Sequence, residues 1–199
     1  MDKSSSYSQN QEQQAIVGYF GTFKGTLVDI GANDGVNFSN SRRLVEMGWI
    51  AHLVEPDPGA YGALVESIRH FPKAVSYEVA IGSQNGRETL KSFEDSLLSI
   101  LSNSEREGFD HFPVKEEVEV EVQDWATFFS GIGSPDIDFL SIDAEGMDLK
   151  ILEQIDLSGI RMVCVEKSQD YQDDKKARLC MDAGMKLIYQ SFENLIFAR

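Results

Sequence analysis

The sequence has few cysteines, no long apolar run and little positive charge, and each shortage excludes a class of protein. The two cysteines, Cys164 and Cys180, lie in no CxxC or Cys/His cluster, which argues against a disulfide scaffold or a zinc site. No apolar run approaches the roughly 18 residues that cross a bilayer, and no basic region followed by a hydrophobic one opens the chain. We therefore predict a cytoplasmic protein with no membrane partner, in which both cysteines are reduced and packed.

Positive charge is scarce. The chain has 18 Lys and Arg against 33 Asp and Glu, a net charge of -15 at pH 7, and its dense charge run at residues 115–121 is acidic. Because such a surface repels phosphate backbones, nucleic acid is not expected as a partner. With 199 residues, of which 42% are hydrophobic, the chain can bury one sizeable core, so residues 1–199 are predicted to form a single domain.

Short apolar runs alternate with segments of helical periodicity. The runs predicted to be strands are residues 26–30, 49–54, 75–80, 137–142 and 162–165. The last two are apolar nearly throughout, which is typical of strands buried on both faces. The clearest helix start has Asp57 as N-cap and Pro58 at the first helical position. This alternation predicts an α/β fold with a mostly parallel sheet and helices on both faces.

The two ends and one middle segment depart from this alternation. Residues 1–10 are polar and Ser-rich and are predicted to be flexible. Near the C-terminus, residues 185–191 and 195–198 are separated by three residues, a length suited to an antiparallel hairpin. Residues 102–113 are predicted to form a mobile loop, and loops of that length are often functional. Ahead of residue 124, valines and glutamates alternate at 117–122, which predicts a strand with one buried face.

The strongest local signal is an apolar strand that ends in an acid and leads into a loop with glycines four apart, at residues 27–35. Gly31 and Gly35 permit a tight turn, and Asp29 at the strand end can receive a cationic amine. The loop is not the GxGxxG turn that binds pyrophosphate, because its third glycine is missing and Asp29 and Asp34 would repel phosphate. An alternative is that the glycines serve backbone geometry alone.

A second acid, Glu55, ends the next predicted strand, about 20 residues further on, where an acid commonly accepts hydrogen bonds from ribose hydroxyls. Its neighbour Asp57 either serves the same ligand or only caps the following helix, and the cap is the favoured interpretation. Acids at two successive strand ends, without a phosphate cradle, indicate a nucleoside ligand that carries a positive charge.

Further acids follow two later strands. Asp143 and Glu145 lie where residues 137–142 lead into a helix, and Glu166 ends the next strand, so all three are expected at the ligand-binding edge of the sheet. Each is a candidate base for removing the proton of a hydroxyl acceptor. The alternatives are a contact of Glu145 with the helix N-terminus and a surface pair of Glu166 with Lys167. A divalent metal on Asp143 and Glu166 is not favoured, since no Asp-Asp or Asp-Asn cluster accompanies Glu166.

Several short motifs follow one another along nearly the whole chain: Tyr7-Ser8-Gln9, Asp29 to Gly35, Ser39-Asn40, Gly48-Trp49, Glu55-Pro56-Asp57, Ala80-Ile81-Gly82 and Ile142-Asp143-Ala144-Glu145-Gly146. Their order and spacing resemble the FkbM family of methyltransferases. The resemblance implies a Rossmann-like class I methyltransferase fold, with S-adenosylmethionine as donor and S-adenosylhomocysteine as product. It also implies action on hydroxyl groups, most often of sugars or other secondary metabolites.

The resemblance implies roles for named residues. Those implied to bind the cofactor are Asp29, Gly31, Ala32, Asn33, Gly35, Asn40, Glu55, Asp57, Ala80, Ile81 and Asp143. In this set Asp29 lies near the methionine amine, Glu55 binds the ribose, and Ala80 and Ile81 flank the adenine. Asn40 alternatively caps the helix that follows it. The chain departs from the usual pattern after Ile81, where no acid is present to hold the adenine amine, so Ser83 or a backbone group would replace it.

These observations together predict an O-methyltransferase that acts on a small hydroxylated acceptor beneath the loop at 102–113. His111, within that loop, is a further candidate base if the loop closes over the acceptor. Two alternatives stay open. One is an NAD-type oxidoreductase on the same fold, and the other is a binding module that retains cofactor affinity without turnover.

Overall fold

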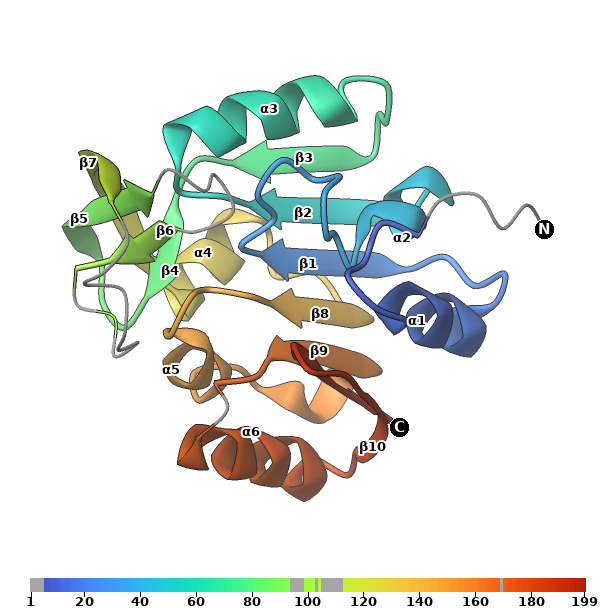
Figure 1. The fold of residues 1–199 in the computed structure, drawn as a ribbon. Coiled ribbons are helices and arrows are strands. Elements are labelled where there is room, and N and C mark those ends of the chain that lie inside the picture. The colour runs from blue at the N-terminus through green and yellow to red at the C-terminus, as the bar shows by residue number, and fades with distance from the viewer. Residues whose placement is uncertain (1–5, 94–98, 103, 105–112, 169) are drawn as a thin grey trace.

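A seven-stranded sheet organises the computed structural model of the chain, which describes residues 6–93, 99–102, 104, 113–168 and 170–199 (Figure 1). Its strand order is β10-β11-β9-β8-β1-β2-β3. The strands that pair in parallel are β1 (Thr26–Ile30), β2 (Ile50–Val54), β3 (Ala74–Tyr77), β8 (Phe139–Ile142) and β9 (Met162–Glu166). The mostly parallel sheet predicted from the apolar runs is therefore confirmed.

The run predicted as one strand at 75–80 is in fact two strands in different sheets. β3 ends at Tyr77, and the chain re-enters regular structure as part of a second sheet with the order β4-β7-β5-β6. Its strands are β4 (Ala80–Gly82), β5 (Gly86–Phe93), β6 (Ser99–Leu101) and β7 (Val114–Asp124). β3 is only partly buried, whereas every residue of β4 is buried. Figure 1 shows the second sheet beyond the carboxyl ends of the central strands.

The alternation of valine and glutamate is realised in β7. Val120 and Val122 are buried, whereas Glu119 and Glu121 are exposed, so the predicted one-sided burial is confirmed. The apolar face of β7 joins the same core as β1 and β8. The second sheet is thereby fixed against the central one.

The C-terminal hairpin is confirmed, but its last strand lies inside the sheet. β10 (Lys186–Gln190) pairs antiparallel with β11 (Asn194–Ala198), and β11 pairs antiparallel with β9. Every residue of β11 is buried, whereas β10 is mostly exposed. The more continuously apolar strand thus takes the position that is covered on both faces.

Helices cover both faces of the central sheet, as predicted. One face carries α1 (Glu12–Phe20), α2 (Arg42–Glu46) and α3 (Pro58–Ile68), and the other carries α4 (Trp125–Gly131), α5 (Asp148–Leu152) and α6 (Tyr171–Asp182). Successive residues of β1 alternate between the two cores, with Leu27 in one and Val28 in the other. Cys164 and Cys180 are both buried, as expected. None of the described helices has the length and apolar character needed to span a membrane.

The start of the chain, predicted to be flexible over residues 1–10, is held in place from Tyr7 onward. The Tyr7 hydroxyl donates a hydrogen bond to Glu46 Oε1 over 2.6 Å, and the Tyr7 backbone N–H donates one to Gln13 Oε1 over 3.0 Å. Residues 1–5 lie outside the described part of the chain. Tyr7 thereby joins the chain to α1 and α2, and the flexibility of residues 1–10 stays a prediction.

Candidate functional site

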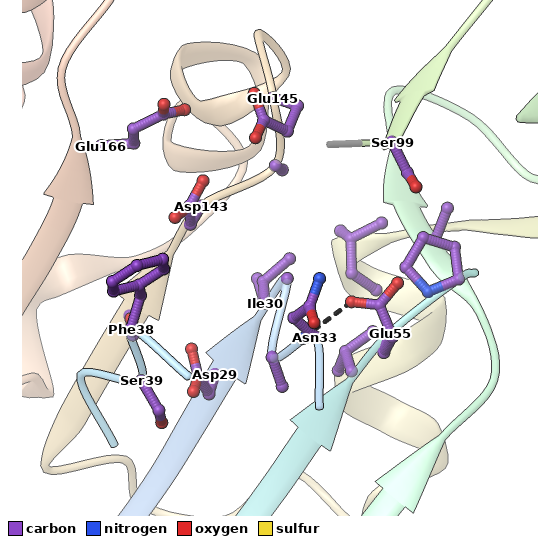
Figure 2. A pocket seen from close by; sticks show the side chains of 18 of the residues that line it. Asp29, Ile30, Asn33, Phe38, Ser39, Glu55, Ser99, Asp143, Glu145 and Glu166 are labelled. Atoms are coloured by element: carbon purple, nitrogen blue, oxygen red, sulfur yellow. Dashed lines mark hydrogen bonds between the residues drawn. The ribbon is translucent and has the colours of Figure 1, made fainter. Parts of the chain in front are cut away.

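A cavity of about 210 Å³ opens at the carboxyl ends of β1, β2, β8 and β9, bordered by the second sheet. Its lining comprises Gln9, Asp29, Ile30, Gly31, Ala32, Asn33, Asn37, Phe38, Ser39, Asn40, Val54, Glu55, Pro56, Val79, Ala80, Ile81, Leu90, Ser99, Leu101, Ser141, Asp143, Ala144, Glu145, Glu166 and Glu193. Figure 2 shows how the acids among them face the same space from different strands. This edge is where open α/β sheets bind their ligands.

Asp29 lies near the end of β1 and is only 4% exposed. Its carboxylate accepts a hydrogen bond from the Ser41 hydroxyl, and the Ser141 side chain is a second partner. Burial raises the pKa of Asp29 above its ordinary value, and the two hydroxyl groups only partly offset this. A cationic group in the cavity would favour the ionised carboxylate.

Glu55 follows β2 and is 5% exposed. Its Oε2 accepts from the Asn33 N–H and its Oε1 from the Asp57 N–H, each over 2.8 Å, and the Asn33 contact is dashed in Figure 2. Burial raises the pKa of Glu55 to about 7, and these two backbone hydrogen bonds oppose the rise. Each carboxylate oxygen can accept more than one hydrogen bond, so Glu55 can also receive ligand hydroxyls.

The turn after β1 is not a phosphate cradle. The N–H groups of Gly31 and Ala32 both donate to the carbonyl oxygen of Val54 over 2.9 Å. Amides that cradle a phosphate must point at the ligand. Here they serve instead to join the turn to the end of β2.

Both glycines of this turn have a positive φ, and Gly31 is also needed for close packing against backbone. Gly31 has φ +83°, and a Cβ there would lie 1.7 Å from the carbonyl oxygen of Asp143. Gly35, with φ +72°, would place a Cβ 2.6 Å from Leu64 Cδ1 on α3. Gly35 belongs to the predicted cofactor set but does not line the cavity. Its role is to let the loop after β1 take its conformation.

Asp57, also in the predicted cofactor set, lies outside the cavity lining and caps α3. Its Oδ1 accepts from the N–H groups of Gly59 and Ala60 over 2.8 and 2.9 Å. Its Oδ2 accepts from the hydroxyls of Ser92 and Ser99. The favoured interpretation of Asp57 as a helix cap is confirmed, and the residue also ties the second sheet to α3.

Asn40 lines the cavity and is 9% exposed. Its Oδ1 is buried and accepts no hydrogen bond from the described residues. The N-cap of α2 is Ser41, so the alternative that Asn40 caps this helix does not describe the structure. A buried acceptor without a donor costs about 1–3 kcal/mol, which a ligand N–H could recover.

Asp143, Glu145 and Glu166 meet at the far end of the cavity, as Figure 2 shows. One carboxylate oxygen of each lies within 4.8 Å of those of the other two. Glu166 is 8% exposed, so it is not half of a surface pair with Lys167. The structure thus brings together the three candidate bases that the sequence distributes over two strand ends.

The loop that carries Glu145 is held by another acid. Asp148 accepts hydrogen bonds from the N–H groups of Ala144 and Gly146, over 2.9 and 3.2 Å, at the start of α5. Glu145 itself has φ +48°, in the left-handed region. The helix-terminus role considered for Glu145 is therefore filled by Asp148, and the Glu145 carboxylate lies with Asp143 and Glu166.

Lys176 of α6 is fully buried and holds the end of β9. Its Nζ donates to the carbonyl oxygen of Glu166 over 2.6 Å and to Ser168 Oγ over 2.7 Å. It also lies 3.9 Å from Asp173 Oδ1. This ammonium group fixes the backbone that presents Glu166 to the cavity.

Replacing Lys176 with methionine is expected to lower the free energy of unfolding by about 3 kcal/mol, because a buried carbonyl and hydroxyl lose their donor and Asp173 loses its nearby charge. Urea denaturation would measure the change. Lys175→Met is the matched control, since Lys175 is exposed over the Tyr171 ring and its loss should cost less than about 0.5 kcal/mol. Equal midpoints for the two variants would contradict the anchoring role.

Some lining residues were not assigned from the sequence. Phe38 has φ +56°, a conformation that a bulky residue rarely adopts and that no sequence pattern signals. Ser99 comes from β6 in the second sheet, and Glu193 from the turn between β10 and β11. Gln9 could have been found, because it belongs to one of the motifs that carry the family resemblance.

Most of the loop predicted at 102–113 lies outside the described residues, and His111 lies there with it. Ser104 is described, and its hydroxyl donates to the carbonyl oxygen of Glu145 over 2.7 Å. This contact links the segment after β6 to the loop that carries the acids. The proposed role of His111 stays a prediction.

Comparison with known proteins points to one family and one fold. A family model described as the methyltransferase FkbM domain matches residues 29–194. The crystal structure of methyltransferase FkbM from Methylobacillus flagellatus KT is 14% identical with a TM-score of 0.57, covering 88% of this chain and 44% of that one. A protein in the NADB-Rossmann superfamily from Streptococcus agalactiae is 12% identical with a TM-score of 0.51, covering 99% and 71%.

A third structure, M. capricolum TrmK in complex with its cofactor product S-adenosylhomocysteine, is 12% identical with a TM-score of 0.48, covering 97% of this chain and 69% of that one. No curated protein matches the chain significantly. The chain spans less than half the length of the first of these structures. The predicted Rossmann-like class I methyltransferase fold is confirmed.

Proposed function

This chain belongs to the FkbM methyltransferase family, and we propose that it transfers a methyl group from S-adenosylmethionine to a hydroxyl of a small acceptor. The observation that supports this most is the character of one cavity. Asp29 and Glu55 are buried in it at the ends of neighbouring strands, and its described lining includes no Lys, Arg or His. Such a cavity suits a nucleoside that carries a positive charge.

The residues present fit S-adenosylmethionine. Its ammonium group can donate hydrogen bonds to the Asp29 carboxylate and to the buried Asn40 Oδ1. Its ribose hydroxyls can donate hydrogen bonds to the Glu55 carboxylate. When bound, it supplies a methyl group on a sulfonium sulfur. Ala80 and Ile81 belong to the apolar part of the lining, where an adenine ring would be held. No acid directly follows Ile81. Ser83 does not line the cavity, whereas Ser99 of the second sheet does and offers a hydroxyl group there.

A dinucleotide fits this cavity less well. Its pyrophosphate would lie near the Asp29 carboxylate, and the N–H groups of Gly31 and Ala32 are already bonded to Val54. These facts favour the methyltransferase over the oxidoreductase on the same fold.

The three clustered carboxylates supply the remaining chemistry. A hydroxyl acceptor must lose its proton around the time of methyl transfer, and transfer itself mainly needs alignment in a site that excludes water. Asp143, Glu145 and Glu166 each offer a carboxylate oxygen that can take this proton. We assign the base to this group, with Lys176 positioning Glu166 through its backbone.

The acceptor we propose is a small molecule, and not a nucleic acid, because the chain carries a net charge of -15 and phosphates would meet an acidic cavity. A sugar or another polyhydroxyl metabolite would match the carboxylates, which accept hydrogen bonds from hydroxyls. A cytoplasmic location stays a prediction.

Calorimetric titration of the purified protein with S-adenosylmethionine, S-adenosylhomocysteine and NAD tests the cofactor assignment. Micromolar binding of the first two and no binding of NAD is the expected result. Binding of NAD alone would favour the oxidoreductase, and no binding of either sulfur nucleoside would reject the proposal. Incubation with methyl-labelled cofactor and a panel of hydroxylated acceptors then distinguishes an enzyme from a binding module.

A further inference from the structure

The end of the cavity away from Glu55 is strongly acidic. Beyond Asp29 and Glu55, its lining includes Asp143, Glu145, Glu166 and Glu193. They come from separate segments: the loop after β8, the end of β9 and the turn between β10 and β11. Among the residues that the structure describes, no Lys, Arg or His joins them in the cavity wall.

An aromatic ring lines the same cavity as these carboxylates. Phe38 is 50% exposed, and Figure 2 draws its ring on the side of the cavity where Asp143 and Glu166 lie. The face of an aromatic ring attracts organic cations. Carboxylates and an aromatic face together form the usual surroundings of a bound ammonium group.

Asn40, which we assign to the cofactor's ammonium group, is a further hydrogen-bond acceptor in the cavity wall. It is 9% exposed, and its Oδ1 has no donor among the described residues. The charged side chains in the described cavity wall are all acidic and favour a positively charged ligand. A ligand that carries carboxylate or phosphate groups would meet no positively charged side chain among the described ones.

We infer that the acceptor is cationic: a hydroxylated compound that carries a protonated amine close to the hydroxyl that is methylated. The inference rests on the proposed function, since it concerns the acceptor end of the same cavity. The carboxylates of Glu166 and Glu193 accept hydrogen bonds from the ammonium group, and the face of the Phe38 ring packs against the same cation. A protonated amine has no lone pair to accept a methyl group, which leaves the neighbouring hydroxyl as the reacting group.

A divalent cation is the other positively charged ligand that these carboxylates could hold. The three oxygens of Asp143, Glu145 and Glu166 lie within 4.8 Å of one another. However, a hard metal ion takes oxygen ligands and gains nothing from an exposed aromatic ring such as Phe38. The ring therefore favours the organic cation, and the experiment below includes the metal as an outcome.

The test uses three sugars that differ at one substituent: glucosamine, glucose and glucuronic acid. Each is titrated into the protein loaded with S-adenosylhomocysteine, at a pH where the amine is protonated. Glucosamine is expected to bind at least about tenfold more tightly than glucose, with glucuronic acid weakest, because charge-assisted hydrogen bonds are the stronger ones. The preference should shrink as salt is added.

Single substitutions test which residues cause the preference for glucosamine. Glu193→Gln and Phe38→Leu should each reduce the preference for glucosamine several-fold without changing the affinity for S-adenosylhomocysteine. Glu119→Gln is the matched control, because this exposed acid on β7 lies outside the cavity lining. It removes the same charge and should leave the preference intact.

Three results would overturn the inference. These are no saturable binding of glucosamine, equal or tighter binding of glucose or glucuronic acid, and binding of Mg²⁺ that displaces glucosamine. All are read on protein already shown to bind S-adenosylhomocysteine, so they leave the proposed function standing. Failure to bind the sulfur nucleosides would instead reject the proposed function.

Discussion

Replacing Glu55 with alanine is expected to weaken the binding of S-adenosylhomocysteine by about a hundredfold or more. The ribose hydroxyls would lose a charged acceptor, and hydrogen bonds to charged groups contribute about 1.5–3 kcal/mol each. Glu55 also accepts the N–H groups of Asn33 and Asp57, so its loss loosens the turn that borders the cofactor. Calorimetry on the folded variant would measure the change in affinity.

Asp57→Ala is the control for this prediction, because Asp57 lies two residues away and belongs to the same motif. Its carboxylate caps α3 and does not line the cavity, so its loss should cost about 1 kcal/mol of stability and leave the affinity unchanged. If the Asp57 variant loses as much affinity as the Glu55 variant, the assignment of the ribose to Glu55 is wrong.

The same carboxylate makes cofactor binding depend on pH. Burial raises the pKa of Glu55 to about 7 in the protein without ligand, and hydroxyl donors favour the ionised form. Binding at lower pH must first remove a proton, so affinity should fall as pH drops below 7, approaching about tenfold per pH unit. A titration in Glu55→Gln should lack this dependence. A flat profile in the native protein would mean that Glu55 is already ionised or does not contact the ligand.

Replacing Gly31 with alanine is expected to lower the free energy of unfolding by more than about 3 kcal/mol. Gly31 has φ +83°, and a left-handed conformation costs a non-glycine residue about 1–2 kcal/mol. The added Cβ would also lie 1.7 Å from the carbonyl oxygen of Asp143, a backbone atom that cannot move without displacing the loop after β8. Urea denaturation would measure the loss, and S-adenosylhomocysteine binding should fall with it.

Gly133→Ala separates the two causes. Gly133 has φ +84°, but a Cβ there meets no atom within 4 Å, so only the conformational cost of about 1–2 kcal/mol applies. The difference between the two variants in lost unfolding free energy therefore measures the cost of the clash between the added Cβ and Asp143. Equal losses would show that the loop adjusts and that this approach is not required.

Much of the sheet could be read from local patterns. The apolar run at 26–30 coincides with β1, and the valines that alternate with glutamates form the one-sided strand β7. These predictions succeed because burial on one or both faces leaves a periodic trace in the residues themselves. The break between Tyr77 and Ala80 leaves no such trace, since Tyr77 packs against the same core in which Ala80 is buried.

The sequence by itself determined the type of fold, the family and the acids at the strand ends, because each of these depends on local order and spacing. The tertiary structure decided which acids face the cavity. Glu55 and Asp57 are carboxylates of one short motif, yet one is buried in the site and the other caps a helix. Their directions depend on Asn33 and on the second sheet. The tertiary structure also decided that Phe38 and Glu193 join Asp143 and Glu166. Contacts between residues so distant in the chain are set by packing, which no local pattern encodes.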